Sequence, residues 1–159
     1  MVRRSASSAV VRARVSWSSA MIPFACIPAA LPPFSLARHA DTILVVEDES
    51  FVCELAAEAL LDEGYRVLTA ADAEEAEAIL SREHVDLLFT DIDLARNTNG
   101  IALARSARRS LPRLPVVYTS GGRDGLSAAE AVNESVFMPK PYRAAQLVAV
   151  TNDLLRHRG

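Results

Sequence analysis

The sequence predicts an α/β protein built on a parallel β-sheet, and two observations carry that prediction. From Asp41 onward, short apolar runs alternate with stretches of helical length, a pattern typical of βαβ units. The apolar runs Ile43–Val46 and Leu87–Phe89 are continuous, which is typical of parallel strands that are covered on both faces. We therefore expect one sheet with helices on both sides and right-handed crossovers.

Five strands and five helices follow from this alternation. The predicted strands are Ile43–Val46, Tyr65–Thr69, Val85–Thr90, Val116–Thr119 and Val136–Met138. The predicted helices are Ser50–Asp62, a segment capped by Asp72 that reaches Leu80, Ile101–Arg109, Asp124–Asn133 and Ala144–Leu155. The segment 124–133 is a poor helix former, because Gly125 lies near its start.

The first 40 residues differ in composition from the rest. They contain five arginines and no acid, so residues 41–159 carry 12 basic and all 20 acidic residues, a net charge of −8. Four prolines between Met21 and Leu36 disfavour the helical core of a signal peptide. We interpret residues 1–40 as a disordered extension, or as the result of a start codon assigned too far upstream, and residues 41–159 as the domain.

Charge and cysteine content narrow the class of protein. The acidic domain disfavours direct binding to the phosphate backbone of a nucleic acid. No run of about 18 apolar residues occurs, so we expect no membrane-spanning helix. Cys26 and Cys53 form no metal-spaced pair, which fits a reducing compartment. We expect a cytoplasmic protein without direct contact to nucleic acid or membrane.

Polar residues follow the predicted strands at one end of the sheet. Glu47 and Asp48 follow the first strand, Asp91 the third, Ser120 the fourth and Lys140 the fifth. Ligands of open α/β sheets bind just beyond the carboxyl ends of the strands. Gathered carboxylates repel one another, and Mg²⁺ is the natural ion for such an all-oxygen set beside phosphate. Since a carboxylate can accept a phosphoryl group, the pocket predicts magnesium-dependent phosphorylation of Asp91.

Four segments together resemble the receiver domain of two-component response regulators, in its stand-alone, single-domain form. They are Ile43–Glu49, Asp86–Asp91, Pro115–Gly121 and Phe137–Tyr142, and the likeness covers about residues 41–157. The resemblance implies a flavodoxin-like (βα)5 three-layer sandwich with a five-stranded parallel sheet of order 2-1-3-4-5. It also implies a cis peptide bond between Lys140 and Pro141.

The resemblance assigns roles to residues of the pocket. Asp91 would be the phospho-acceptor, and Lys140 would contact the phosphate. Mg²⁺ would bind to Asp48, Glu47 and Asp91, with the backbone carbonyl of Asp93 completing its shell. The protein would be no enzyme beyond its own phosphorylation and dephosphorylation.

The resemblance also implies a signalling mechanism. A sensor histidine kinase or a histidine phosphotransfer protein would phosphorylate the domain. Ser120 and Phe137 would then switch, and so change the surface of the fourth helix, fifth strand and fifth helix. Output would pass to a protein target or through a homodimer.

Two other functions stay open at this point. The chain departs from the family beside the acceptor, where Leu94-Ala95 stands in place of the usual Met-Pro and Asn99 in place of an Asp. A receiver-like binding module that never uses phosphate is therefore one alternative. The Asp-x-Asp spacing of Asp91 and Asp93 also fits a phosphatase of the haloacid dehalogenase type.

Overall fold

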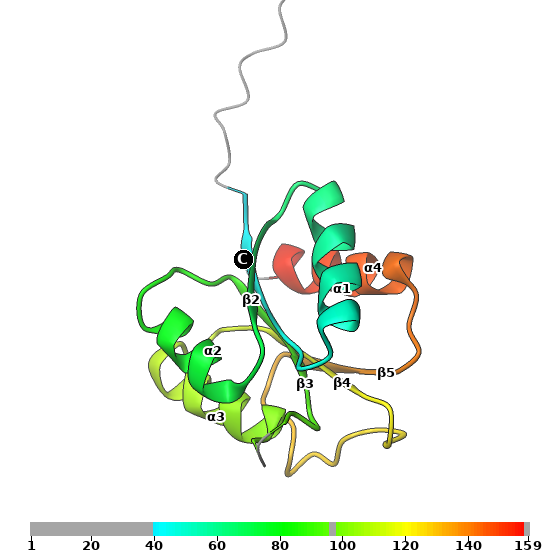
Figure 1. Ribbon diagram of the computed structural model, residues 1–159. Helices are drawn as coiled ribbons and strands as arrows, with labels where there is room; N and C mark the ends of the chain where they lie inside the picture. The colour runs from blue at the N-terminus through cyan, green and yellow to red at the C-terminus, as the bar shows by residue number, and fades with distance from the viewer. Residues whose placement is uncertain (1–39, 96–97, 158–159) are drawn as a thin grey trace, which may run out of the picture. The chain divides into compact units, whose positions relative to one another are not determined.

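Five parallel strands form one sheet in the order β2-β1-β3-β4-β5 (Figure 1). The computed structural model describes residues 40–95 and 98–157. The strands are β1 (Thr42–Val46), β2 (Arg66–Ala70), β3 (Leu87–Asp91), β4 (Val116–Ser120) and β5 (Ser135–Pro139). The pairing confirms the predicted fold class and strand order. The predicted extension of residues 1–40 lies, apart from Ala40, outside the described residues.

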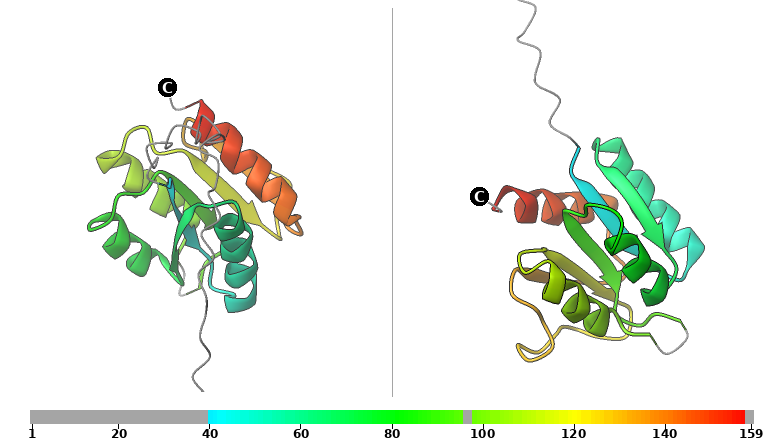
Figure 2. Two further views of the ribbon diagram at one scale, coloured as in Figure 1. Left: turned by 90° about the horizontal axis from the view of Figure 1, so that it is seen from above. Right: turned by 90° about the vertical axis from the view of Figure 1, so that its left-hand side faces the viewer.

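Helices cover both faces of the sheet (Figure 2). One face is covered by α1 (Ser50–Asp62) and α4 (Ala144–Arg156), and the other by α2 (Ala73–Leu80) and α3 (Gly100–Ser110). Asp72 caps α2 as predicted, because its Oδ1 accepts a hydrogen bond from the N–H of Glu75 at 2.9 Å. No helix in the described part of the chain is long and apolar enough to cross a bilayer.

The alternation of side chains along each strand builds two hydrophobic cores. Ile43 and Val45 of β1 pack with α1 and α4, whereas Leu44 and Val46 pack with α2 and α3. All four side chains are fully buried, because each central strand has helices on both faces. The continuous apolar runs in the sequence follow directly from this double cover.

The predicted helix Asp124–Asn133 does not form, so the described residues contain four helices where five were predicted. Only a single turn exists there, in which the N–H groups of Glu130 and Ala131 donate to the carbonyl of Ser127 at 3.0 and 3.1 Å. The Glu130 carboxylate accepts from the N–H and the hydroxyl of Ser127 and pairs with Arg123 at 2.8 Å. These local bonds compete with helical ones.

Two arginines of α3 explain why the turn is not continued. Arg105 donates to the carbonyl of Ala129 at 2.5 Å, and Arg108 donates to the carbonyl of Asn133. These two carbonyls accept hydrogen bonds from side chains of α3 instead of from the N–H groups of a helix of their own. Tertiary contacts therefore override the local preference of residues 127–131 for helix. We refer to residues 121–134 as the β4–β5 segment.

Candidate functional site

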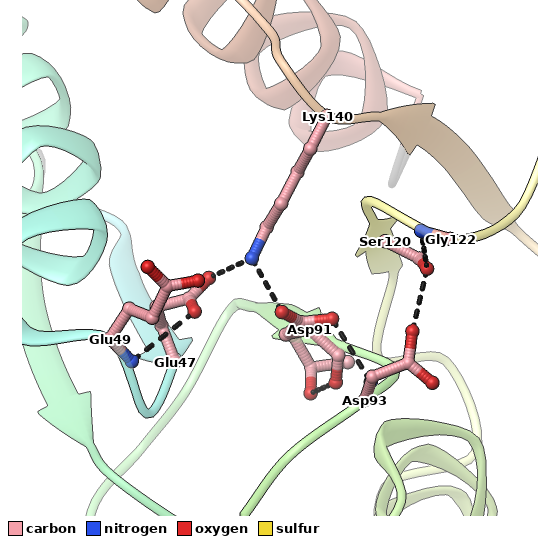
Figure 3. A network of polar contacts seen from close by, with 8 residues as sticks. Glu47, Glu49, Asp91, Asp93, Ser120, Gly122 and Lys140 are labelled. Carbon is pink, nitrogen blue, oxygen red and sulfur yellow. Dashed lines mark hydrogen bonds and ion pairs between the residues drawn. The ribbon is translucent and has the colours of Figure 1, made fainter.

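The sheet order brings four strand ends together at one edge. Val46 of β1 pairs with Thr90 of β3, and Ser120 of β4 pairs with Pro139 of β5. Because β3 lies between β1 and β4, the residues that end or follow these strands converge. Figure 3 shows the polar network that results, with side chains at the ends of β3 and β4 and just after β1 and β5.

Lys140 joins two buried carboxylates. Its Nζ lies 2.7 Å from Oε2 of Glu47 and 2.5 Å from Oδ2 of Asp91. Glu47 is 2% exposed and Asp91 is 5% exposed. Two carboxylates this close and this dry require a cation nearby, and the ammonium group of Lys140 supplies that charge.

The electrostatics of this cluster are set by burial and by the ion pairs. Burial lowers the pKa of Lys140, but the hydrogen bonds and charges of Asp91 and Glu47 outweigh burial and raise it. Burial raises the pKa of Glu47, while Lys140 opposes that shift. Lys140 therefore stays positively charged at neutral pH. A second cation would further favour the ionised form of Glu47.

Asp93 and Ser120 form a second pair in the same pocket. The hydroxyl of Ser120 donates to Oδ2 of Asp93 at 2.7 Å and accepts from the N–H of Gly122 at 3.1 Å. The main-chain N–H of Asp93 donates to Oδ1 of Asp91 at 3.0 Å. Thr119 is fully buried, and its hydroxyl has no partner within the described ranges. Of these two neighbouring hydroxyls, that of Ser120 joins the polar network and that of Thr119 does not.

The comparison with known proteins follows from this arrangement. The model of the response regulator receiver domain matches residues 43–152. The chain belongs to the response regulator receiver family. A response regulator receiver protein from Sinorhizobium medicae is 32% identical, with a TM-score of 0.72, over 76% of this chain and 98% of that one. The receiver domain of the hybrid histidine kinase CckA is 34% identical, with a TM-score of 0.62, over 72% and 98% of the two chains.

Similar curated proteins are larger regulators. The nitrogen assimilation regulatory protein NtrX of Azorhizobium caulinodans is 36% identical over 73% of this chain and 26% of its own. The phosphate regulon transcriptional regulatory protein PhoB of Pseudomonas aeruginosa is 32% identical over 74% and 53%. The chain spans between about a quarter and about half of these relatives' lengths.

Receiver domains bind Mg²⁺ at an acidic pocket, and this chain has such a pocket. Glu47, Asp48 and Asp91 each offer a carboxylate oxygen, and these oxygens lie within 4.8 Å of one another. Asp48 is exposed while the other two are buried, so one side of the cluster is open to solvent. Hard oxygen donors on an open rim fit a magnesium ion that keeps several waters.

Phe137 lies outside the polar network of this receiver domain. It is partly buried on the face covered by α2 and α3 and is paired in register with Tyr118 of β4. The Lys140-Pro141 peptide bond is cis, as the family resemblance predicts.

The loop after the acceptor closes tightly on Asp91. Asn99 caps α3 by accepting from the N–H of Ile101 at 2.7 Å, and it forms an isolated antiparallel bridge with Asp93. The N–H of Gly100 donates to the carbonyl of Ile92 at 3.1 Å. Leu94, which replaces the usual Met, is 6% exposed and joins the hydrophobic core. The departures from the family motif are therefore accommodated by burial and capping.

An apolar cavity opens beside Lys140. It has a volume of about 550 Å³ and lies between α1 and the start of α4. Its lining includes Val52, Leu55, Tyr142 and Leu147. Leu55 is 50% exposed and Phe51, one turn earlier on α1, is 71% exposed. The exposure of these two apolar side chains was not predicted from the sequence.

Proposed function

We propose that the protein works as a single-domain response regulator that accepts a phosphoryl group on Asp91. The observation that carries this proposal is the position of Lys140, which bridges the buried carboxylates of Asp91 and Glu47. The receiver protein of S. medicae, matched over 98% of its length, supports a stand-alone form. Output then passes through protein contacts or a homodimer.

A phosphohistidine on a kinase or a phosphotransfer protein is the proposed donor. One carboxylate oxygen of Asp91 forms a bond to phosphorus, the P–N bond breaks, and its electron pair stays on the imidazole. Lys140 stabilises the negative charge of the transferred group. Glu47, Asp48, Asp91 and the carbonyl of Asp93 would hold Mg²⁺. When bound, Mg²⁺ neutralises charge on the phosphoryl oxygens.

The apolar cavity beside Lys140 supports protein-mediated transfer. Leu55 lines the cavity and is half exposed, and the exposed Phe51 lies one turn earlier on α1; we call these two side chains the apolar rim. A helix of the donor protein that covers this rim brings its histidine next to Asp91 and excludes water from the transfer. The acidic charge of the domain makes a nucleic acid a poor direct partner.

The proposed response runs through Ser120 and Phe137. A phosphoryl group adds roughly −1.5 to −2 charge at neutral pH, which recruits the Ser120 hydroxyl toward the acceptor. Movement of Ser120 at the end of β4 leaves space for Phe137 of β5 to turn inward. Because the fourth predicted helix is absent, the responding surface consists of the β4–β5 segment, β5 and α4.

The haloacid dehalogenase alternative gains nothing from the structure. In that family the Asp-x-Asp motif lies at the end of the first strand, whereas here Asp91 ends β3 and Asp93 follows it. The Asp93 carboxylate accepts a hydrogen bond from the hydroxyl of Ser120 and so is occupied by a protein donor. A phosphate-independent binding module is the outcome that a failed labelling experiment would indicate.

Labelling with acetyl phosphate tests the proposal. In the presence of Mg²⁺, intact-mass measurement should find one phosphoryl group on the wild-type protein and none on Asp91→Asn. Asp124→Asn, which removes an exposed aspartate outside the pocket, is the matched control and should label normally. Labelling of Asp91→Asn at the wild-type level would overturn the assignment, as would wild-type labelling that a chelator leaves unchanged.

A further inference from the structure

The hydroxyl proton of Ser120 is already engaged in the structure. A serine hydroxyl has one donor hydrogen, and Ser120 gives it to Oδ2 of Asp93 at 2.7 Å. The oxygen of the same hydroxyl accepts from Gly122. Ser120 therefore has no hydrogen left to donate to a phosphoryl oxygen on Asp91 while the bond to Asp93 exists (Figure 3).

Hydrogen bonds fix the backbone of Asp93, whereas no buried packing holds its side chain. Its N–H donates to Asp91 and its backbone bridges to Asn99, so its Cα is fixed beside the acceptor. Its side chain, however, belongs to an exposed residue. The carboxylate can rotate into solvent without losing buried contacts, and the backbone stays in place when it does.

A phosphoryl group on Asp91 supplies the force for that rotation. It places roughly two negative charges beside the carboxylate of Asp93, and like charges at such a site repel.

We propose that the Asp93 side chain restrains the Ser120 hydroxyl until the acceptor is phosphorylated, and so sets the threshold of the switch. This inference rests on the proposed function of Asp91. Asp93 is a positioning residue here, because it acts through Ser120.

A double-mutant cycle tests the restraint, with beryllofluoride and Mg²⁺ as the phosphoryl mimic. Affinity is measured for the wild type, Asp93→Ala, Ser120→Ala and the double variant, after circular dichroism has verified that each is folded. Asp93→Ala removes a negative charge in both backgrounds, but it frees a hydroxyl only where Ser120 is present. We expect the affinity gain to be about three- to tenfold larger in the Ser120 background, as for loss of one solvent-accessible side-chain hydrogen bond.

Each outcome of the cycle has a distinct meaning. An equal gain in both backgrounds would show a pure charge effect and overturn the inference while leaving Asp91 as the acceptor. No binding by the wild type would overturn the proposed function as well.

Glu49→Ala, which removes an exposed acid beside Glu47, is the control. It should change the affinity for beryllofluoride by the same factor with and without Ser120. The amide resonance of Gly122, whose N–H donates to Ser120, should move in Asp93→Ala and stay in place in Glu49→Ala; an unmoved resonance in Asp93→Ala would contradict the restraint.

Discussion

A Cβ atom on Gly100 would lie 2.0 Å from the main-chain carbonyl oxygen of Asp91. The first residue of α3 thus packs directly against the backbone of the candidate acceptor. The same Cβ would lie 2.7 Å from the hydroxyl oxygen of Thr90. No rotation of a side chain relieves the contact with a carbonyl, so the loop from Asp91 to α3 depends on a glycine at this position.

Gly100→Ala should therefore destabilise the fold by about 1–3 kcal/mol, the usual cost of overpacking a tight site. Urea unfolding measures the change. Gly125→Ala is the matched control, since nothing lies within 4 Å of its added Cβ, and it should leave the free energy of unfolding nearly unchanged. Equal stability of Gly100→Ala and the wild type would refute the close approach.

Lys140→Met should destabilise the magnesium-free protein by roughly 2–4 kcal/mol, because Glu47 and Asp91 stay buried without their cation. The raised pKa of Lys140 means that its ion pairs contribute fully at neutral pH and are lost only as the pH rises through that pKa. Thermal or urea unfolding with and without Mg²⁺ is the measurement. Mg²⁺ should recover more stability in the variant than in the wild type.

The control for this change is Arg66→Met. Arg66 pairs with Glu83 at 2.9 Å, but both side chains are about half exposed, so its loss should cost less than about 1 kcal/mol. Similar losses in the free energy of unfolding for the two variants would mean that the Lys140 ion pairs are not shielded from solvent.

The pocket was predictable from sequence because parallel strands align their carboxyl ends. Apolar runs that end in Glu47, Asp91 or Lys140 identify the strand ends, and the order of the strands places these ends next to one another. The bond between Asp93 and Ser120 was not predictable, since the family resemblance assigns only the backbone of Asp93. Spacing along a chain does not say which side-chain atom faces a neighbouring strand.

The absence of the helix at 124–133 and the role of Gly100 could not be predicted from the sequence for a different reason. Ala128, Ala129 and Glu130 are good helix formers, and the contacts that override them come from Arg105 and Arg108 on a separate helix. Only the packed structure reveals which atoms approach Gly100.

Arg108→Ala should loosen the β4–β5 segment. The guanidinium group of Arg108 donates to the carbonyls of Pro112 and Asn133, so its loss frees both. We expect amide exchange between residues 127 and 134 to quicken about five- to thirtyfold, for 1–2 kcal/mol of lost hydrogen bonding. Arg109→Ala is the control, because Arg109 bonds only to Ser106 of its own helix in the described hydrogen-bond network. Equal exchange in both variants would contradict this role.

The carboxyl of Glu130 should titrate far below the ordinary range for glutamate. The hydrogen bond from Arg123, with those from Ser127, lowers the pKa of Glu130 from 4.5 to about 2. A depressed folded pKa means that the bond stabilises the segment above pH 4.5 and is lost as the pH falls toward about 2. Carboxyl-carbon NMR should find this low pKa in the wild type and a value closer to 4.5 in Arg123→Ala. A wild-type pKa near 4.5 would argue against the ion pair.

The central claim is that Asp91 accepts the phosphoryl group, and identifying the modified residue tests it most directly. After labelling with acetyl phosphate and Mg²⁺, borohydride reduces an aspartyl phosphate to an alcohol and so marks its position for peptide mass spectrometry. The account predicts a single mark at Asp91. A mark at Asp48 or Asp93 with Asp91 unmodified would contradict it.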